Sequence, residues 1–470
     1  MVLRKYGRDL LWLALSLLVF LLGLGLISGA PFALARPAVS PISQPSLHKA
    51  GEVQQGAYSV TLTETPGCGP WSIVPSVNPS PNGDIFRGIA AISPNDVWAV
   101  GAYSNSYRTV IEHWDGTQWS DVQSPGPIGG STNNQLYAVA AISSNDVWAV
   151  GFYMSNALYQ PLIEHWDGTT WSIVSSPGVG SYNTQLYAVA AVGANDVWAV
   201  GYYASTPYTM LTEHWDGTTW SIVAAPSARP VSNVLTSVVA VSTNDVWAAG
   251  VSPSGVYQTV IEHWDGAHWS VIPSPSPGSG GNGLYAVAAA GPGDIWAAGW
   301  YFDSGNPVRP LTEHWDGTAW TVVPSPGAGT GQNPLTGLAV VSANDVWAVG
   351  TSDENLLAPH KLTLHWDGTG WSTVSDPNVN SAGDYLYAVT AISNNAESDV
   401  WAAGWSKSGT AQFTLTERYA CLRANSTSTP SLTPPPSPNL TSTYLPTDTP
   451  TDTSTNTPTN TPTTGCLPCS

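Results

Sequence analysis

A block of about fifty residues occurs seven times in this chain of 470 residues. Aligning the copies on the tripeptide Asp-Val/Ile-Trp places the recurring tryptophan at Trp98, Trp148, Trp198, Trp247, Trp296, Trp347 and Trp401. The copies are 49 to 54 residues apart, a period that is typical of β-propeller blades and of solenoid repeats. We therefore expect one supersecondary unit, repeated around an axis or along a line.

Each copy contains four short segments with β-strand character. In the second copy they span 135–142, 146–151, 161–167 and 171–174, separated by Ser/Asn and Asp-Gly turns. No helical periodicity occurs between them. Val, Ile, Trp and Tyr occupy both faces of these segments, which suits a sheet packed between two other sheets. The sequence therefore predicts an all-β fold, a seven-bladed β-propeller with four antiparallel strands per blade.

The seventh copy lacks its fourth strand. In the other six copies a Trp-Ser/Thr segment follows His-Trp-Asp-Gly, whereas the seventh continues as LTERYACLR. The missing segment occurs instead ahead of the first copy, as WSIV at 71–74. We predict that this segment closes the ring as the outer strand of the seventh blade, which leaves no blade edge open.

Two cysteines support the same closure. Aligned on the other copies, Cys68 and Cys421 both fall at the turn between the third and fourth strands. A disulfide between them would replace the turn that the chain break removes. It would close a loop of roughly 350 residues, for which the chain-entropy model gives an upper value of about 5 kcal/mol. The alternative is a pair of unrelated free thiols.

The N-terminus indicates export. Three basic residues within the first eight precede an apolar run from 10 to 27, and a small-residue site ends at Ala35. We expect residues 1–35 to be a signal peptide that is cleaved near Ala35, so that the protein is secreted or displayed at the cell surface. Export permits the disulfide. The apolar run has 18 residues, so an uncleaved membrane anchor is the alternative.

Composition divides the rest of the chain. Residues 36–66 form a linker, 67–423 the propeller, and 424–470 a tract of Ser, Thr, Pro and Asn that is typical of a disordered, low-complexity stalk. The stalk contains glycosylation sequons and ends in Cys466 and Cys469. For these cysteines a local disulfide, an intermolecular cross-link and a truncated further module all remain open.

Charge limits the partners. The net charge is −19, and most of the acids recur at fixed positions of the repeat. From 68 to 423 there are only eight Lys or Arg, scattered singly, so no basic surface for nucleic acid is expected. We expect a monomer that contacts a membrane only through an uncleaved signal or an envelope attachment. A glycan or an extracellular protein is the expected partner.

The recurring acids and histidines have a structural interpretation. Glu-His pairs recur in five copies, of which Glu164 and His165 are one, and both side chains are good metal ligands. Adjacent strand residues point to opposite faces, however, so a pair does not converge on one ion. We expect no metal, and expect His and Glu to bond to backbone or to Trp and Asp groups between blades. Asp146 and Asp167 are expected to cap their own turns.

Catalytic and cofactor motifs are missing. The sequence contains no GxSxG, no HExxH, no phosphate-binding glycine loop and no four-cysteine zinc pattern. We therefore assign no catalytic residue and no cofactor. Acids from different blades that meet at the axis are the route by which this chain could be an enzyme, a polysaccharide hydrolase or lyase.

The loops differ between the two faces of the predicted propeller. Loops joining strands one to two and three to four are nearly uniform, whereas those joining strands two to three and successive blades vary in length and residues. Aromatic residues stand among Asn, Ser and Gln in these variable loops, as in a recognition surface. The alternative is that many of these rings only cover the blade ends. The candidate ligand-binding residues are Tyr107, Tyr159, Tyr208, Tyr257 and Tyr301.

The repeat DVWAVG…EHWDGTxWS, which covers about 350 of the 470 residues, resembles repeats of secreted bacterial β-propellers that are loosely grouped with kelch-like proteins. It is similar to kelch and Asp-box blades in its Trp-rich four-strand design, but lacks the kelch double glycine and the Asp-box spacing. The resemblance implies the fold. From the loops we expect a non-catalytic extracellular module for binding or adhesion. A secreted polysaccharide hydrolase or lyase and a structural envelope protein are the alternatives.

Overall fold

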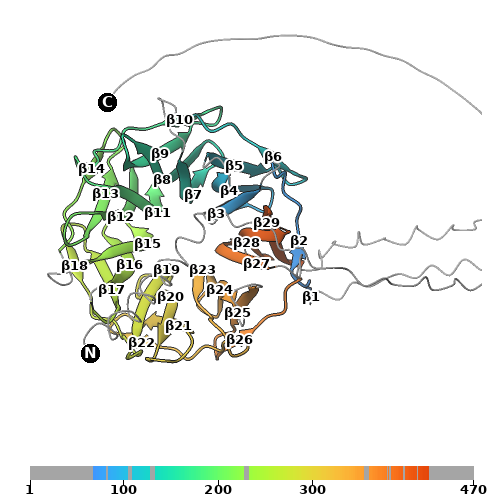
Figure 1. Cartoon of the computed structure of the whole chain (residues 1–470). Helices are drawn as coiled ribbons and strands as arrows, with labels where there is room; N and C mark the ends of the chain where they lie inside the picture. The colour runs from blue at the N-terminus through green and yellow to red at the C-terminus, as the bar shows by residue number, and fades with distance from the viewer. Residues whose placement is uncertain are drawn as a thin grey trace, which may run out of the picture. The chain divides into compact units, whose positions relative to one another are not determined.

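The computed structural model describes residues 67–422, apart from 81–82, 104–107, 127–132, 227–231, 254, 354–358, 378, 380–382, 395–396 and 410. In this part of the chain, strands β1 to β29 form seven antiparallel sheets arranged around one axis (Figure 1). The predicted seven-bladed propeller with four antiparallel strands per blade is confirmed. The predicted signal peptide, linker and stalk, with Cys466 and Cys469, lie outside the described residues.

Successive blades take successive strands. Blade one contains β3 (Asp84–Ser93), β4 (Asp96–Tyr103), β5 (Thr109–Trp114) and β6 (Trp119–Asp121). Blade two contains β7 (Asn134–Ser143), β8 (Asp146–Ser155), β9 (Leu158–Trp166) and β10 (Trp171–Ile173). Blade three contains β11 (Thr184–Gly193), β12 (Asp196–Tyr203), β13 (Thr209–Trp215) and β14 (Trp220–Ile222). Blade four contains β15 (Val234–Ser242), β16 (Asp245–Ser252), β17 (Gln258–Trp264) and β18 (Trp269–Val271).

The remaining blades continue in the same order. Blade five contains β19 (Gly281–Gly291), β20 (Asp294–Phe302), β21 (Arg309–Trp315) and β22 (Trp320–Val322). Blade six contains β23 (Leu335–Ser342), β24 (Asp345–Ser352), β25 (His360–Trp366) and β26 (Trp371–Thr373). Blade seven contains β27 (Asp384–Asn394), β28 (Glu397–Ser408) and β29 (Ala411–Leu422), to which β1 (Gly67–Cys68) and β2 (Ser72–Ile73) are added.

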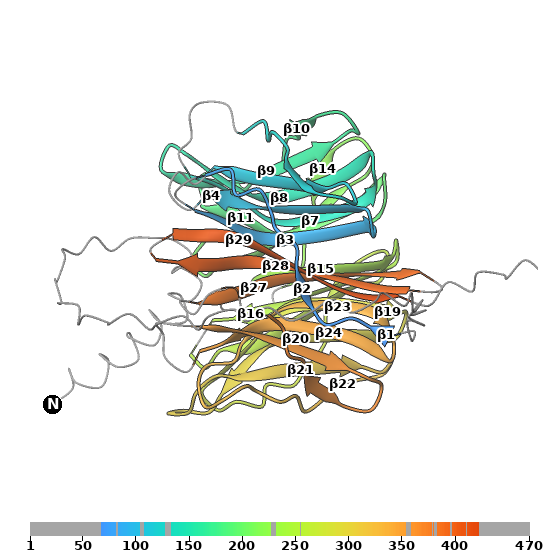
Figure 2. The same cartoon turned by 90° about the vertical axis from the view of Figure 1, so that its right-hand side faces the viewer.

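The N-terminal segment closes the ring, as the sequence predicts. Strand β2 pairs with β29 through Ser72 opposite Arg418 and Ile73 opposite Glu417 (Figures 1 and 2). Strand β1 pairs with the end of β29 and places Cys68 opposite Cys421. Cys421 is disulfide-bonded. A bond from it to Cys68 agrees with this register and stays a prediction.

Tryptophans join each blade to the next. The Trp98 ring of blade one lies 5.1 Å from the Trp166 ring and 5.4 Å from the Trp171 ring of blade two, measured between centroids. The same contact closes the circle, because Trp401 of blade seven lies 5.8 Å from Trp119 of blade one, edge to face. Indole rings bury large apolar areas in these geometries. The core of the propeller is therefore a circle of aromatic contacts between sheets.

Histidines of the repeat bond within their own blade. In blade two, His165 Nε2 lies 2.8 Å from Asp146 Oδ1, and the imidazole stacks on Trp148 at 4.1 Å between centroids. Blade seven substitutes Arg418, which donates from Nε to Asp399 Oδ1 at 2.8 Å. The expected bonding between blades is thus wrong for these histidines, because strands two and three of one sheet already place His beside Asp.

The acids of the two turns differ in role. Asp167 Oδ1 accepts from the backbone N–H groups of Thr169 and Thr170, both at 2.8 Å, which is the predicted turn cap. Five exposed turn aspartates of this kind have a pKa lowered to about 2 by such hydrogen bonds, namely Asp115, Asp167, Asp216, Asp316 and Asp367. Asp146, expected to cap its own turn, instead binds His165.

Glutamates of the repeat are buried between neighbouring blades. Glu164 accepts from Ser124 Oγ of the preceding blade at 2.8 Å, and Glu213 accepts from Ser176 Oγ at 2.9 Å. The serine stands five residues after the tryptophan of the outer strand, so the end of one blade is fastened to the third strand of the next. The expected bonding of Glu between blades is confirmed at these two positions, with serine hydroxyls as donors.

At two blade junctions, the loss of one member of this serine and glutamate pair leaves the other member without a hydrogen-bond partner. Ala225 stands where the donor would be, and both carboxyl oxygens of Glu262 are buried without a hydrogen-bond partner in the described structure. At another junction Leu364 replaces the glutamate, and Ser325 Oγ is buried without a partner there. Because a buried polar atom without a partner lowers stability, these junctions are weaker than the complete ones.

Completing one junction is expected to stabilise the protein. Ala225→Ser should raise the free energy of unfolding by about 1 kcal/mol, the usual net value of a buried hydrogen bond, because the new hydroxyl can donate to Glu262. Urea denaturation followed by tryptophan fluorescence measures the change. Ala224→Ser adds the same hydroxyl at the exposed neighbouring position and should have no effect. Equal stabilities of the two variants would contradict the assignment.

Candidate ligand-binding site at the propeller axis

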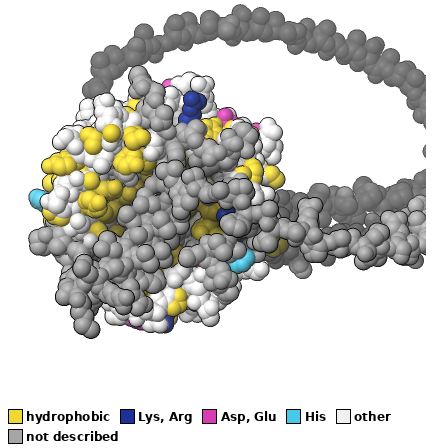
Figure 3. Space-filling model, in the orientation of Figure 1, with side chains coloured by type: hydrophobic (Ala, Val, Ile, Leu, Met, Phe, Trp, Pro, Cys, Tyr) yellow, Lys and Arg dark blue, Asp and Glu magenta, His cyan; other side chains and the backbone are white. Residues whose placement is uncertain are grey.

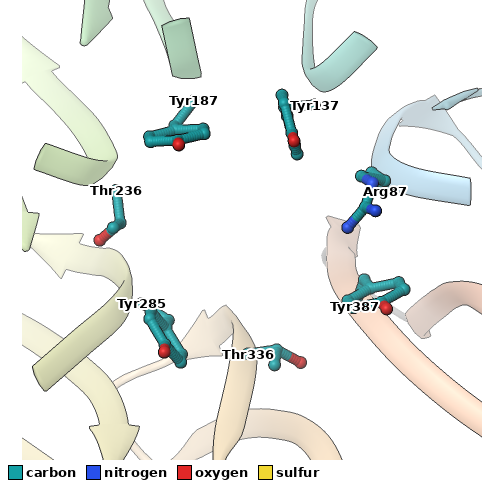
Figure 4. Close-up of a pocket in the computed structure, with 7 residues that line it drawn as sticks. All are labelled: Arg87, Tyr137, Tyr187, Thr236, Tyr285, Thr336 and Tyr387. Atoms are coloured by element: carbon teal, nitrogen blue, oxygen red, sulfur yellow. The ribbon is translucent and has the colours of Figure 1, made fainter. Parts of the chain in front are cut away.

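A cavity of about 130 Å³ lies on the propeller axis. Each blade contributes one residue to its lining (Figure 4). In chain order they are Arg87, Tyr137, Tyr187, Thr236, Tyr285, Thr336 and Tyr387. We call them the axial ring. They belong to the innermost strands β3, β7, β11, β15, β19, β23 and β27 (Figure 1).

A β-bulge aims every axial residue at the axis. In blade two the pairing passes from Leu136 opposite Gly151 to Ala138 opposite Val150, which leaves Tyr137 unpaired. The same shift occurs at the equivalent residue of the other six blades. A bulge bends its strand and redirects a side chain. The bulge therefore turns these side chains out of the apolar core between blades and toward the axis.

The bulge also explains the glycine of the DVWAVG motif. A Cβ atom at Gly151 would lie 1.9 Å from the carbonyl oxygen of Gln135, on the partner strand. No side chain fits such a distance, so only glycine allows the two backbones to approach. The motif thus encodes the bulge as well as the blade core.

Arg87 is the one charged member of the axial ring. Its guanidinium carbon lies 5.1 Å from the centroid of Tyr137 and 5.0 Å from that of Tyr387, one ring in each neighbouring blade (Figure 4). Both contacts are cation–π interactions. Arg87 forms no ion pair with any described residue, and its Nε is buried without a hydrogen-bond partner. In the described part of the chain, no acid neutralises the positive charge of the cavity.

The other axial residues are neutral. Burial raises the pKa of Tyr137 and Tyr187, and raises that of Tyr285 to about 12. These phenols keep their protons at physiological pH and act as hydrogen-bonding groups without charge. Thr236 and Thr336 each donate to a carbonyl of the next blade at 2.8 Å, and so present the remaining lone pairs and a methyl group. None of the described residues that line the cavity is acidic.

Aromatic residues extend outward from the axial ring in two blades. In blade two, Tyr137 lies 5.7 Å from Phe152, which lies 4.7 Å from Tyr159. In blade three, Tyr187 lies 5.7 Å from Tyr202, which lies 5.4 Å from Tyr208. We call these two series the aromatic spokes. They start at the axis and end where strands two and three are joined. Tyr208 lies in the β12–β13 loop, whereas Tyr159, predicted as a loop residue, is the second residue of strand β9.

The predicted loop residues occupy different positions around these spokes. Tyr159 and Tyr208 form their outer ends, and Tyr208 is 44% exposed. Tyr257 contacts Trp300 at 6.0 Å, and Trp300 contacts the axial Tyr285 at 6.3 Å. Tyr301 lines a second cavity of about 220 Å³ beside Arg309. Tyr107 lies outside the described residues. The structure therefore connects Tyr159, Tyr208 and Tyr257 to the axis and separates Tyr301 from it.

The exposed surface agrees with the position of the spokes. Hydrophobic side chains gather over the second and third blades on the face that Figure 3 displays. Exposed aromatic residues of blade three include Tyr208 and Tyr182, the latter 45% exposed and 6.0 Å from Tyr203. A clustered apolar surface with polar surroundings is typical of an interaction site.

Residues that bind metals do not assemble in the described structure. No three of the described His, Cys, Asp and Glu side chains are grouped so that they could hold an ion. The repeated glutamates, 0% exposed at Glu164 and Glu262, lie between blades and cannot reach a ligand on the axis. The described residues also include no helix long and apolar enough to span a membrane.

Sequence reasoning missed the axial ring. The aligned copies do carry the signal, because the position after the Leu or Phe of the first strand holds Arg87 in one copy and Tyr or Thr in the others. A strict alternation of strand residues assigns this position to the packing between blades. The bulge, which the alternation does not contain, moves it to the axis.

Comparisons with known proteins assign this chain to no family. No protein-family model matches the chain, and no curated protein matches it. The kelch-like assignment of the repeat therefore stays a prediction.

Similar solved structures include one titled YCF48 bound to D1 peptide, with 16% identity over 74% of this chain and 96% of that chain and a TM-score of 0.47. A GH74 xyloglucanase from Xanthomonas campestris has 13% identity over 73% of this chain and 55% of its own, with a TM-score of 0.47. The six-bladed fucose-binding lectin of Aleuria aurantia has 16% identity over 63% and 95%, with a TM-score of 0.41. These likenesses carry no argument about function.

Proposed function

We propose that this propeller is a non-catalytic extracellular binding module that recognises a glycan or a protein through its variable-loop face and the axial cavity. The observation that carries the proposal is the pair of aromatic spokes. One spoke connects the half-buried Tyr159 of strand β9 with the axial cavity, and the other connects the exposed Tyr208 of the β12–β13 loop with it, each through an unbroken series of ring contacts.

The physical chemistry of these rings suits recognition. Tyrosine offers a large apolar face and a hydroxyl with little side-chain entropy to lose, and its ring stacks on sugars or on protein side chains. Tyr202 and Phe152 hold the outer tyrosines against the rigid sheet edges. A surface that is already ordered loses less freedom when a ligand binds.

The hydrolase alternative needs carboxylic acids near a substrate. Glycoside hydrolysis generally requires two carboxyl groups on opposite sides of the scissile bond. None of the described residues that line the axial cavity is a carboxylic acid. The binding function is therefore favoured. The secreted or cell-surface location and the monomeric state belong to the same proposal.

Screening the purified full chain on a glycan array and against extracellular proteins tests the proposal. The triple variant Tyr159→Ala, Tyr208→Ala and Tyr257→Ala should weaken binding by about ten-fold or more, because stacked rings contribute strongly to recognition. The matched control replaces Ile173, Ile222 and Val271 by alanine, three exposed apolar residues of the outer strands. Binding that both variants retain, or silence of the wild type on every surface, would contradict the proposal.

A further inference from the structure

We propose that the axial cavity binds the carboxylate of an acidic sugar, a uronic acid residue of a glycan, with Arg87 as its charge partner. This inference rests on the proposed binding function and names its ligand class. Four observations carry it: the state of the arginine, the absence of competing acids among the described lining residues, the neutral aromatic wall, and the volume of the cavity.

The arginine is prepared for an anion. Tyr137 and Tyr387 cover its guanidinium at 5.1 and 5.0 Å and hold it at the axis. Two rings that cover the faces of a guanidinium leave the edge with its N–H groups accessible. A carboxylate fits that edge with two parallel hydrogen bonds. In Figure 4, Arg87 points into the cavity, toward the space that the axial ring encloses.

The cost of holding this arginine also indicates a ligand. A partly buried cation is usually paired with an acid, yet Arg87 has no ion pair in the described part of the chain, and its buried Nε has no acceptor. The other six blades hold Tyr or Thr at this position. The scaffold therefore does not require an arginine here, and a ligand anion would supply the missing partner.

The charge of the whole protein limits the anion. With a net charge of −19, the long-range field repels polyanions. A single cation in the cavity matches one carboxylate rather than a densely sulfated or phosphorylated chain. A glycan with a charge on one sugar of the bound segment fits this pattern.

The remaining wall favours a sugar ring over a peptide end. Tyr187 and Tyr285 present ring faces. The Tyr187 hydroxyl, which donates to Gln185 Oε1 at 3.0 Å, and the two axial threonines present acceptor lone pairs. These groups complement the apolar faces and hydroxyls of a pyranose. The volume of about 130 Å³ is close to the roughly 150 Å³ of a cavity that admits a six-membered ring.

Titration calorimetry of the full chain tests the inference with tetrasaccharides in which only one sugar is a uronate, either galacturonate, guluronate or glucuronate, each compared with its methyl ester. At least one acid should bind about ten-fold or more tightly than its ester, the usual effect of a charged hydrogen bond. Arg87→Thr should reduce the affinity for that acid to the level of the ester and leave the ester unchanged. Threonine already occupies this position in two blades, so the variant should fold.

Arg309→Thr is the matched control. It removes the same charge from an exposed arginine outside the axial ring, and should leave the affinities for acid and ester unchanged. The inference would be overturned if every acid bound the wild type and Arg87→Thr with equal affinity. Equal affinities of the wild type for acid and ester would also overturn it. A third contrary outcome is that a tripeptide with a free C-terminal carboxylate binds more tightly than every uronide. That result would indicate a protein ligand.

The two proposals fail separately. If the loop-tyrosine triple variant loses a ligand that Arg87→Thr retains, the binding function holds and the axial uronate site is wrong. If no ligand of any kind is found for the wild type, both are wrong.

Discussion

Trp71→Ala is expected to lower the free energy of unfolding by about 3–5 kcal/mol, the usual cost of removing a large aromatic side chain from a core. Trp71 is 3% exposed and lies 5.4 Å from Trp347 of blade six and 5.8 Å from Tyr419 of its own blade. The expected loss is large because the closing strand β2 pairs through only two residues, Ser72 and Ile73. Backbone hydrogen bonds such as that from Val74 N–H to Thr416 O remain, but the apolar contacts of this segment with blade six are lost.

Trp71→Ala should also change the cooperativity of unfolding, which the loss of an ordinary core residue does not. An open ring exposes the edge of β29 and separates blade seven from its closing strand, so unfolding should become less cooperative. Urea denaturation, followed by tryptophan fluorescence and by circular dichroism, should give two transitions that no longer coincide. Ile73→Ala is the control, since Ile73 belongs to the same strand but is 38% exposed. If both variants lose the same small amount of stability, the closing role of Trp71 is wrong.

Stability is expected to fall as the pH rises from 5 to 8.5. Burial raises the pKa of Glu112, Glu164 and Glu213 to about 7, and that of Glu262 and Glu313 to about 8. These carboxyls are protonated in the folded state at pH 5, whereas the unfolded chain releases their protons above its ordinary value of 4.5. Their contribution is therefore complete below pH 4.5 and is lost as the pH rises through 7 to 8.

The size of the effect follows from the same shifts. One pKa unit corresponds to about 1.4 kcal/mol, so each buried carboxyl loses on the order of 2–4 kcal/mol across this range. The turn aspartates have lowered pKa values near 2 and change protonation only in more acidic solutions. Urea midpoints between pH 5 and 8.5 therefore report the buried acids, to which Asp84, with a pKa raised to about 6, and Glu417, with a pKa raised to about 7, also contribute.

One pair of variants separates the glutamates. Glu262→Gln should leave the free energy of unfolding at pH 5 nearly unchanged, because the carboxyl of Glu262 has no hydrogen-bond partner to lose. It should raise the free energy of unfolding at pH 8.5, because the glutamine side chain cannot ionise. Glu417→Gln should destabilise the protein at both values, because Glu417 is paired with the buried ammonium of Lys361. A flat pH profile in the wild type, or identical responses of the two variants, would falsify this account.

The sequence predicts the scaffold because its signals are local and repeated. Seven Asp-Val/Ile-Trp motifs give the number of blades, and Trp71 stands five residues before Ser76 just as Trp119 does before Ser124. Closure needs no knowledge of the third dimension, since the seventh copy lacks the piece that precedes the first. The turn caps are predictable for the same reason, because an Asp followed by Gly accepts hydrogen bonds from the backbone N–H groups of the same turn in each copy.

The site was less predictable because it depends on contacts between blades. The loop tyrosines carry a composition signal, but their ring contacts to Phe152 and Tyr202 follow from the bend of the sheet edge. The alternation of strand residues predicts that Tyr137 packs between blades, whereas the bulge turns its side chain to the axis. The serine and glutamate pairs are likewise invisible in a single copy, since their members belong to successive blades.

The bulge has an evolutionary consequence. A residue that does not pair with a neighbouring strand and lies outside the apolar core between sheets can be exchanged with little effect on either, as the mixture of Arg87, Thr236 and Tyr285 at one register illustrates. Repeat duplication would have started such a ring with seven equal members. Single substitutions could then differentiate it, one blade at a time, while selection on folding remained almost blind to them. The axis is thus the part of this propeller in which a new binding specificity can arise with the smallest loss of stability.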